Sequence, residues 1–280
     1  MEMVKVSDWD QLYNIIKESA IDADLNYLDV SEMTSLSNLF NLSLFNGDIS
    51  KWDVSNVRNM SNLFYGSKFN GDISNWDVSN VENMSSMFDY SLFNGDISRW
   101  DTSKVTNMGF MFSDSRFNGD ISKWNTSRVK DMCWMFDGSE FNGDISEWDT
   151  SRVKYMNNMF QKSKFNGDLS KWNVSEVIHI SGMFKCSRFE GDLSNWDVSK
   201  VNDMKEMFCS SQFNSDISKW DISNVMDLRY MFYESKFDQD VLDWKIRPNA
   251  EVSFMFTDCP AGERLEVKTI THSSILTRVN

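Results

Sequence analysis

Proline, cysteine and histidine are scarce in this chain of 280 residues, which holds two prolines, four cysteines and two histidines. Because prolines are so few, and because no stretch is dominated by serine, glycine or charge of one sign, the sequence offers no linker between domains. No apolar run approaches the ~20 residues of a transmembrane helix, so we expect no membrane insertion. The sequence therefore predicts one continuous domain.

The cysteines form no recognisable motif, since none belongs to a Cys-x-x-Cys pair. We expect free thiols in a reducing compartment, rather than disulfides or a zinc site. The first nine residues also lack the basic, apolar and small-residue succession of a signal peptide. A cytoplasmic protein is expected for the chain as given, and a surface or secreted one if a leader was removed. The cysteines are Cys133, Cys186, Cys209 and Cys259.

Negative charge is in excess, with 42 Asp and Glu against 28 Lys and Arg, a net charge of -14. This charge repels phosphate backbones and anionic membranes, so we expect neither nucleic acid nor a membrane surface as a partner. A protein partner with a basic surface is favoured.

A motif of eight residues, Phe-Asn-Gly-Asp-(Ile/Leu)-Ser-x-Trp, recurs with a period of 24 residues. A fixed period between about 20 and 50 residues is typical of a solenoid, in which each unit buries its apolar face against the next. The tryptophans that mark the period are Trp52, Trp76, Trp100, Trp124, Trp148, Trp172, Trp196, Trp220 and Trp244.

The apolar residues of one unit suggest a strand followed by a helix. Trp52 and Val54 are two residues apart, which suits a short strand that presents both side chains to the core. The apolar residues from Val57 to Phe64 are then spaced like one face of a helix, which Ser55 is placed to cap. The pattern predicts an α/β solenoid with one short parallel strand and one helical segment in each repeat.

The sequence divides into three segments. In residues 1–20 we expect a capped amphipathic helix that covers the open end of the core, and in residues 21–260 a solenoid of ten units. Residues 261–280 are expected to form a half-repeat cap with Lys268 in the tryptophan position, where a lysine discourages end-to-end stacking.

An aspartate follows the turn of each tryptophan-bearing unit, first at Asp48. A column of carboxylates repels itself unless local donors hold each one, so we expect each aspartate to accept bonds from the backbone or from the Ser50-type hydroxyl. A ladder of calcium ions is the alternative, although the glycine-dense motifs of calcium-binding β-helices are missing. We expect no metal and no cofactor, and we expect Gly47 to supply a positive φ.

The unit that begins at Phe69 reads FNGDISNWDVSNVENMSSMF. It resembles the repeats of the DUF285 or BspA-like family, a relative of leucine-rich-repeat proteins, and the resemblance runs from about residue 21 to residue 260. This resemblance implies a right-handed curved solenoid with a parallel sheet on one face. It also implies a role in adhesion or protein binding and no reaction, in proteins that are usually exported or lipid-anchored.

Two sets of residues vary between units and are candidates for binding. Beside the tryptophans, basic side chains alternate with aspartates, so this surface is either self-neutralised or a polar docking surface. These basic residues are Lys51, Arg99, Lys123 and Lys171.

The second set lies on the predicted helix, opposite its buried face. Phe110 and Trp134 occupy this position in successive units, and exposed aromatics beside arginine are typical of binding hot spots. We expect the patch to bind a partner or a second copy of the chain, with incidental exposure as the alternative. Tyr230 and Phe254 share the position but are expected beneath the C-terminal tail. The full patch is Phe110, Trp134, Tyr155, Arg128 and Arg152.

No catalytic motif is present, because His179 and His272 lie near no nucleophile motif and the P-loop, GxSxG and HExxH patterns are missing. We therefore expect a non-catalytic protein-binding or adhesion-type solenoid. An acidic mimic of DNA that inhibits a basic DNA-binding protein or nuclease is the alternative. Such a rod would carry one net negative charge per ~3.4 Å of its length, about half the charge density of duplex DNA.

Overall fold

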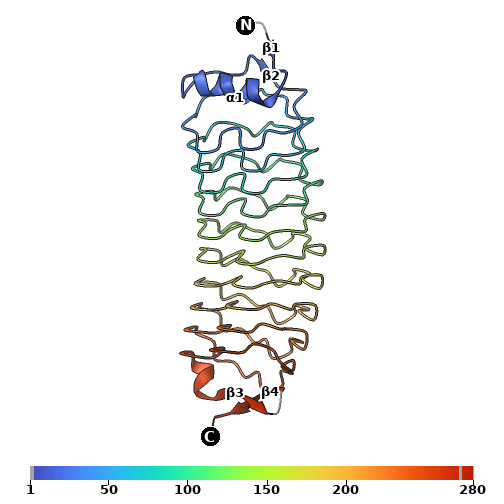
Figure 1. Cartoon of the computed structure of the whole chain (residues 1–280), viewed down its shortest axis with the longest axis vertical. Helices are drawn as coiled ribbons and strands as arrows, with labels where there is room; N and C mark the ends of the chain where they lie inside the picture. Colours follow the sequence, from blue (N-terminus) through green and yellow to red (C-terminus); the bar gives the residue numbers. More distant parts are fainter. Residues whose placement is uncertain (1–2, 271–272, 280) are drawn as a thin grey trace.

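The chain is a repeat protein whose 24-residue units lie one above another along one axis (Figure 1). The computed structural model describes residues 3–270 and 273–279. Between residues 30 and 259, all of which are described, the units consist of turns and single β-bridges. The named elements lie at the two ends: β1 (Val4–Lys5), the α-helix α1 (Trp9–Glu18), β2 (Leu28–Asp29), the 3-10 helix η1 (Pro260–Glu263), β3 (Leu265–Ile270) and β4 (Ser273–Arg278).

Helix α1 begins where local hydrogen bonds satisfy its first amides. Asp8 Oδ1 accepts from the N–H of Gln11 at 2.9 Å, and Gln11 Oε1 accepts from the N–H of Ser7 at 2.7 Å. The apolar face of the helix buries Leu12 and Ile16 in the core. Strand β1 pairs in parallel with β2, so the N-terminal segment is joined to the first repeat.

Adjacent repeats are joined by parallel β-bridges that lie away from the predicted strand. One ladder of bridges runs from residue 35 to residue 251 and joins residues 24 apart, as in Asn59↔Asn83, and a separate bridge joins Asp24 and Asp48. The strand predicted at Trp52 and Val54 is therefore wrong. Trp52 and Val54 lie between two turns. In the first turn the N–H of Trp52 donates to the carbonyl of Ile49 at 3.2 Å, and in the second the N–H of Val57 donates to the carbonyl of Val54 at 2.9 Å. Both side chains point inward because the chain bends there, which imitates the two-residue period of a strand.

The helical segment predicted in each repeat is also wrong. The segment contains two successive turns, and the third residue of each has a positive φ, 54° at Asn62 and 59° at Gly66. Alternate N–H groups, such as those of Met60 and Asn62, donate to the carbonyls of the next repeat at 2.9 Å. A helix would use these donors within its own segment, whereas the stacked arrangement uses them between units.

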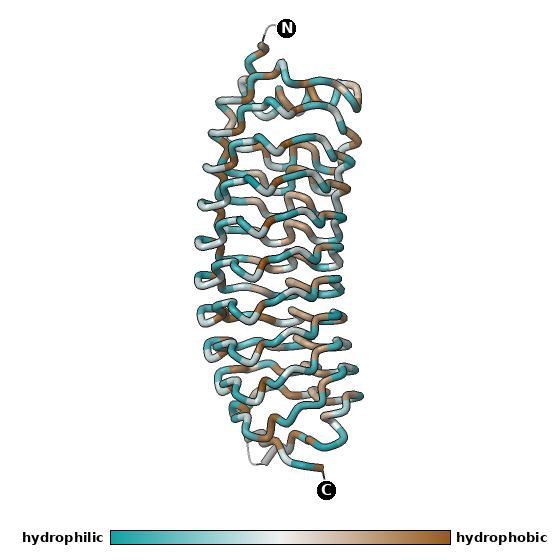
Figure 2. The backbone as a smooth tube through the Cα atoms, turned by 180° about the vertical axis from the view of Figure 1, so that it is seen from behind, coloured by the Kyte–Doolittle hydropathy of each residue, from teal (hydrophilic) through white to brown (hydrophobic). Residues whose placement is uncertain are grey.

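The core consists of aromatic side chains stacked along the axis. Trp52 and Trp76 lie 6.4 Å apart with nearly parallel rings, and Phe64 and Phe69 lie 4.4 Å apart. The indole Nε1–H of Trp76 donates to the carbonyl of Ile49 in the preceding repeat at 3.1 Å, so the buried ring leaves no polar atom unpaired. Figure 2 shows the resulting alternation of hydrophilic and hydrophobic stretches around every turn of the chain.

The aspartate column is held by local donors. Asp48 Oδ1 accepts from the N–H of Ser50 at 2.9 Å, and the same contact recurs in the following units. These backbone bonds, and then bonds from the serine hydroxyls, lower the pKa of carboxylates such as Asp72. In the part of the chain that the structure describes, no group of three His, Cys, Asp or Glu side chains could hold a metal ion.

The turn glycines serve a different purpose from the predicted one. Gly71 is not among the residues with positive φ. Instead, a Cβ atom at this position would lie 2.9 Å from the ring of Phe69 and 3.3 Å from the carbonyl oxygen of Gly47. The glycine is needed because the backbone passes directly over a core ring.

The C-terminal segment does not continue the 24-residue coil. Strands β3 and β4 form an antiparallel hairpin with Leu265 opposite Arg278, where a half-repeat cap was predicted. Arg278 reaches Asp240 at 2.9 Å, and the preceding Arg264 reaches Asp238 at 2.5 Å. A parallel strand needs a long return connection, whereas this short segment can pair only with itself. The side chain of Lys268 lies outside the described residues.

Candidate functional site

One side of the stack varies strongly between repeats, and we call it the variable face. It comprises the residues equivalent to Asn59, Ser61 and Asn62 in each unit, and the bridge ladder runs along it. The residues equivalent to Asn59 are Ser35, Asn83, Asn107, Asp131, Tyr155, His179, Asp203, Asp227 and Glu251. Those equivalent to Asn62 are Asn38, Ser86, Phe110, Trp134, Asn158, Gly182, Glu206, Tyr230 and Phe254.

Every residue equivalent to Asn62 has a left-handed backbone, with φ of 60° at Phe110 and 58° at Trp134. Asparagine and glycine tolerate this conformation, whereas a bulky side chain costs about 1–2 kcal/mol there. Aromatic residues at this position therefore do not serve the stability of the backbone.

Phe110 and Trp134 pack against each other across two repeats. Their ring centroids are 5.8 Å apart and their planes differ by 6°. Phe110 is 40% exposed and Trp134 is half-buried. The two residues project outward from a turn, and the helix on which they were predicted does not exist.

Tyr155 belongs to the neighbouring column, because it is equivalent to Asn59 and not to Trp134. It is 38% exposed and stacks on His179 with a centroid distance of 5.8 Å. At this position asparagine or aspartate usually accepts a bond from the residue two positions later, as Asn83 does from Ser85. His179 was missed by the sequence reasoning, although two successive departures from an Asn/Asp column are a usable signal.

The structure brings Trp134, Tyr155 and His179 together. They line one shallow groove on the variable face, with two acidic residues and polar or thiol side chains around them. Burial and the charge of Asp131 raise the pKa of the Cys133 thiol to about 12, so the thiol is neutral. The remaining lining residues are Asp131, Asn157, Asn158 and Asp203.

The predicted arginines do not join this group. Arg128 and Arg152 are exposed, but they occupy a different repeat position from the aromatic residues. Neither arginine lines the groove. Hydrogen bonds from Ser151 lower the pKa of Asp149, and the charge of Arg152 lowers it further. Arg152 thus lies beside an aspartate of its own repeat.

The basic residues beside the tryptophans form a separate, charge-compensated surface. Lys51, Arg99, Lys123 and Lys171 are all exposed. Lys171 pairs with Glu147 of the preceding repeat at 2.5 Å. The other three lie near the aspartates of their own units, where they add to the effect of serine hydrogen bonds in lowering the carboxyl pKa values.

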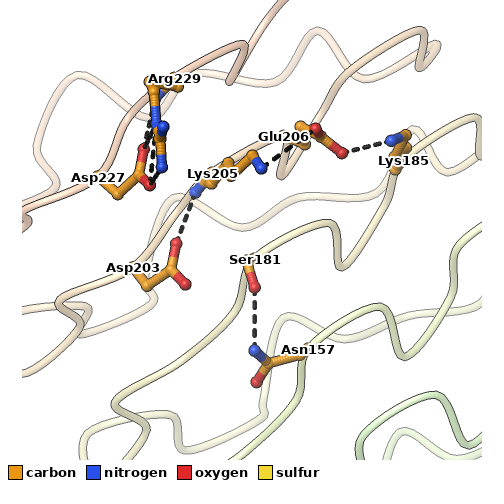
Figure 3. Close-up of polar contacts among 8 residues, drawn as sticks. All are labelled: Asn157, Ser181, Lys185, Asp203, Lys205, Glu206, Asp227 and Arg229. Carbon is orange, nitrogen blue, oxygen red and sulfur yellow. Dashed lines mark hydrogen bonds and ion pairs between the residues drawn. The ribbon is translucent and has the colours of Figure 1, made fainter. Parts of the chain in front are cut away.

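Toward the C-terminus the variable face becomes a network of ion pairs (Figure 3). Glu206 pairs with Lys185 and, at 3.8 Å, with the ammonium of Lys205. Arg229 pairs with Asp227 at 2.5 Å. These charges are satisfied within the protein and are less available to a partner.

Tyr230 and Phe254 lie beyond this network and correct a prediction. Phe254 is 55% exposed, and the two rings stack 5.0 Å apart. Phe254 is therefore not buried beneath the C-terminal tail, although Leu265 and Val267 of β3 line the same hollow, and Tyr230 is half-buried.

A buried acidic pair lies at another repeat position and was not foreseen. Asp89 is 5% exposed, and its Oδ1 has no hydrogen-bond partner. Burial raises the pKa of Asp89 to about 7, and the carboxylates of Asp114 and Asp137 add to the rise. Burial also raises the pKa of Asp137, which accepts a bond from Gln161 at 3.1 Å.

Comparison with known proteins identifies one family. A family model described as "Mycoplasma protein of unknown function, DUF285" matches residues 7–116, 89–188, 115–209 and 164–266. The DUF285 resemblance found in the sequence is thereby confirmed. Neither the curated proteins nor the solved structures contain a match. In the described ranges, no helix is long and apolar enough to cross a membrane.

Proposed function

Because the chain belongs to the DUF285 family, a repeat family of unknown function, we propose that it is a non-catalytic protein-binding solenoid. The solenoid is of the leucine-rich-repeat type, and its variable face carries the binding site. Stacked repeats suit this role, because they present an extended surface whose residues can change without loss of the core.

One observation carries the proposal. Phe110 is exposed and Trp134 is half-buried, and both aromatics lie at left-handed positions, where asparagine and glycine fit better. Such residues reduce stability unless they have another use, and aromatic anchors are typical of interface hot spots.

The proposed partner has a basic surface. The net charge of -14 attracts it, and the lysine-bearing surface beside the tryptophans, where Lys171 pairs with Glu147, is already neutralised by its own carboxylates. The same lysines and arginines interrupt the acidic columns, which makes a DNA mimic the weaker alternative.

The proposal is tested by affinity capture from the native cell or its host, with wild type and Phe110→Asn/Trp134→Asn as baits. Asparagine fits this backbone, as Asn62 and Asn158 show, so the variant should fold. We expect the variant to capture a partner of the wild-type protein at less than about one tenth of the wild-type amount, which is the effect of removing a hot-spot residue. Tyr230→Asn/Phe254→Asn is the matched control and should keep that partner.

The proposal fails if the Phe110 and Trp134 variant captures the partner as wild type does. A partner that is released by free duplex DNA would support mimicry instead. Light scattering of both proteins tests self-association, since a dimer held by this pair would become monomeric in the variant.

A further inference from the structure

The groove beside Trp134 combines aromatic rings with carboxylates at both ends. Asp131 lies at its N-terminal end and Asp203 at its C-terminal end, with Trp134, Tyr155 and His179 between them. The groove therefore extends over four successive repeats.

Each of two rings in the groove has one ring partner among the described residues. Phe110 covers one face of Trp134, and His179 covers one face of Tyr155. The side chain of Asn158 extends toward Gly182, where a Cβ atom would lie 2.0 Å from its Oδ1. Asn158 thus extends away from the Trp134 ring, toward a position where glycine makes room for it.

The carboxylates at the ends are only partly used. Asp131 Oδ1 accepts from the N–H of Cys133 at 2.9 Å, and Asp203 Oδ1 accepts from the N–H of Lys205 at 3.0 Å. The second oxygen of Asp203 is 3.9 Å from His179 Nδ1. The ammonium of Lys205 is directed at Glu206 and not into the groove (Figure 3).

We propose that this groove binds an arginine side chain of the protein partner, whose guanidinium stacks on Trp134 or Tyr155 and pairs with Asp131 or Asp203. The inference rests on the proposed function and specifies the chemistry of the partner. A guanidinium is planar, stacks on aromatic faces and pairs with carboxylates through two parallel bonds, so it uses both kinds of group that the groove offers.

Other ligands use fewer of these groups. A lysine ammonium is a compact, strongly hydrated charge and cannot form the two parallel bonds. A sugar ring would stack on an aromatic face but needs no paired carboxylates. Lys130 and Lys154 are neighbours of the lining residues in sequence, but neither of them lines the groove.

The test is a titration of the ¹⁵N-labelled full-length chain with acetyl-Gly-Arg-Gly-amide, followed by NMR at low salt. The signal of the Trp134 indole N–H is identified by its absence in Trp134→Asn. We expect a saturable shift of this signal. The same peptide with citrulline, which has the shape of arginine without its charge, should bind at least about tenfold more weakly.

Matched variants separate the groove from the overall charge. The variant Asp131→Asn/Asp203→Asn keeps the turn contact, because Asn59, Asn83 and Asn107 make the same contact at this position. It should lower the affinity for the arginine peptide by about tenfold or more. Asp101→Asn/Asp149→Asn removes the same charge elsewhere, at a position where Asn125 and Asn173 occur naturally, and should change the affinity less than about twofold.

The inference is overturned if the arginine peptide gives no saturable shift, if citrulline binds equally well, or if both charge variants weaken binding equally. It is also overturned if maltose shifts the Trp134 signal and the arginine peptide does not. Loss of the arginine result alone leaves the proposed function standing, provided that the captured partner still requires Phe110 and Trp134.

Discussion

Individual positions of the repeat differ in what their backbone and surroundings allow. At the position of Asn62 a left-handed φ favours asparagine, and at the position of Asn59 a short carbonyl side chain closes a turn. Phe110, Trp134 and Tyr155 satisfy neither requirement. Exceptions to a repeated local rule are the residues that we propose for recognition, because they do not serve the local fold.

Asp89 is the residue whose charge should limit stability at neutral pH. Its pKa in the folded protein is raised to about 7, so the folded state holds its proton over a pH range in which the unfolded chain has lost it. This contribution is complete below the unfolded pKa of about 4 and is lost as the pH rises through 7. We predict that Asp89→Asn raises the free energy of unfolding at pH 8 by roughly 1–3 kcal/mol, and that the gain at pH 5 is clearly smaller because only the first part of the contribution has been lost there.

Urea denaturation at the two pH values checks this prediction. Asp72→Asn is the control, because the pKa of Asp72 is lowered by its bonds to Ser74 and the carboxylate is ionised at both pH values. An equal effect of Asp89→Asn at pH 5 and pH 8 would show that Asp89 is not protonated in the folded state.

At the scale of the repeat, the sequence revealed the period and the buried residues but not the local conformation. Trp52, Met60 and Phe64 were correctly placed inside. Their spacing was read as a strand and a helix because it shows only which side chains point inward. In a stack the backbone bonds go to the next unit, and one unit alone does not contain this information.

The candidate site was predicted only in part. Phe110 and Trp134 were found because aromatics at a variable outward position are visible in an alignment of the repeats. His179 was missed because the bridge ladder that brings it beside Tyr155 was not foreseen. The burial of Asp89 was missed because most residues at its position, such as Ser113, Gln161 and Lys185, are polar and give no consistent apolar signal.

Far-UV circular dichroism distinguishes the observed repeat from the one with a helix. Helix α1 has ten residues in a chain of 280, so the negative band at 222 nm should be weak. A helix in every repeat would increase the helical signal several-fold. A spectrum with the deep double minimum of a largely helical protein would contradict the structure described above.

The whole molecule presents two long surfaces with different properties. The surface beside the tryptophans balances basic residues against aspartates, as in the pair between Lys171 and Glu147. The variable face changes from polar to aromatic to ion-paired along the axis. A molecule with a net charge of -14 should also bind a basic partner faster at low salt than at high salt.

The most direct measurement compares the affinity of the captured partner for two variants that alter one surface each. In the first, Phe110 and Trp134 are changed to Asn. In the second, Lys51, Arg99, Lys123 and Lys171 are changed to Asn, which occurs naturally at the equivalent position of two other repeats, as Asn75 and Asn195. We predict that the first variant binds at least about tenfold more weakly although its thermal stability is no lower than that of wild type, and that the second binds within about threefold of wild type. The opposite result, full affinity without the aromatic pair and loss of affinity without the basic residues, would contradict the assignment of binding to the variable face.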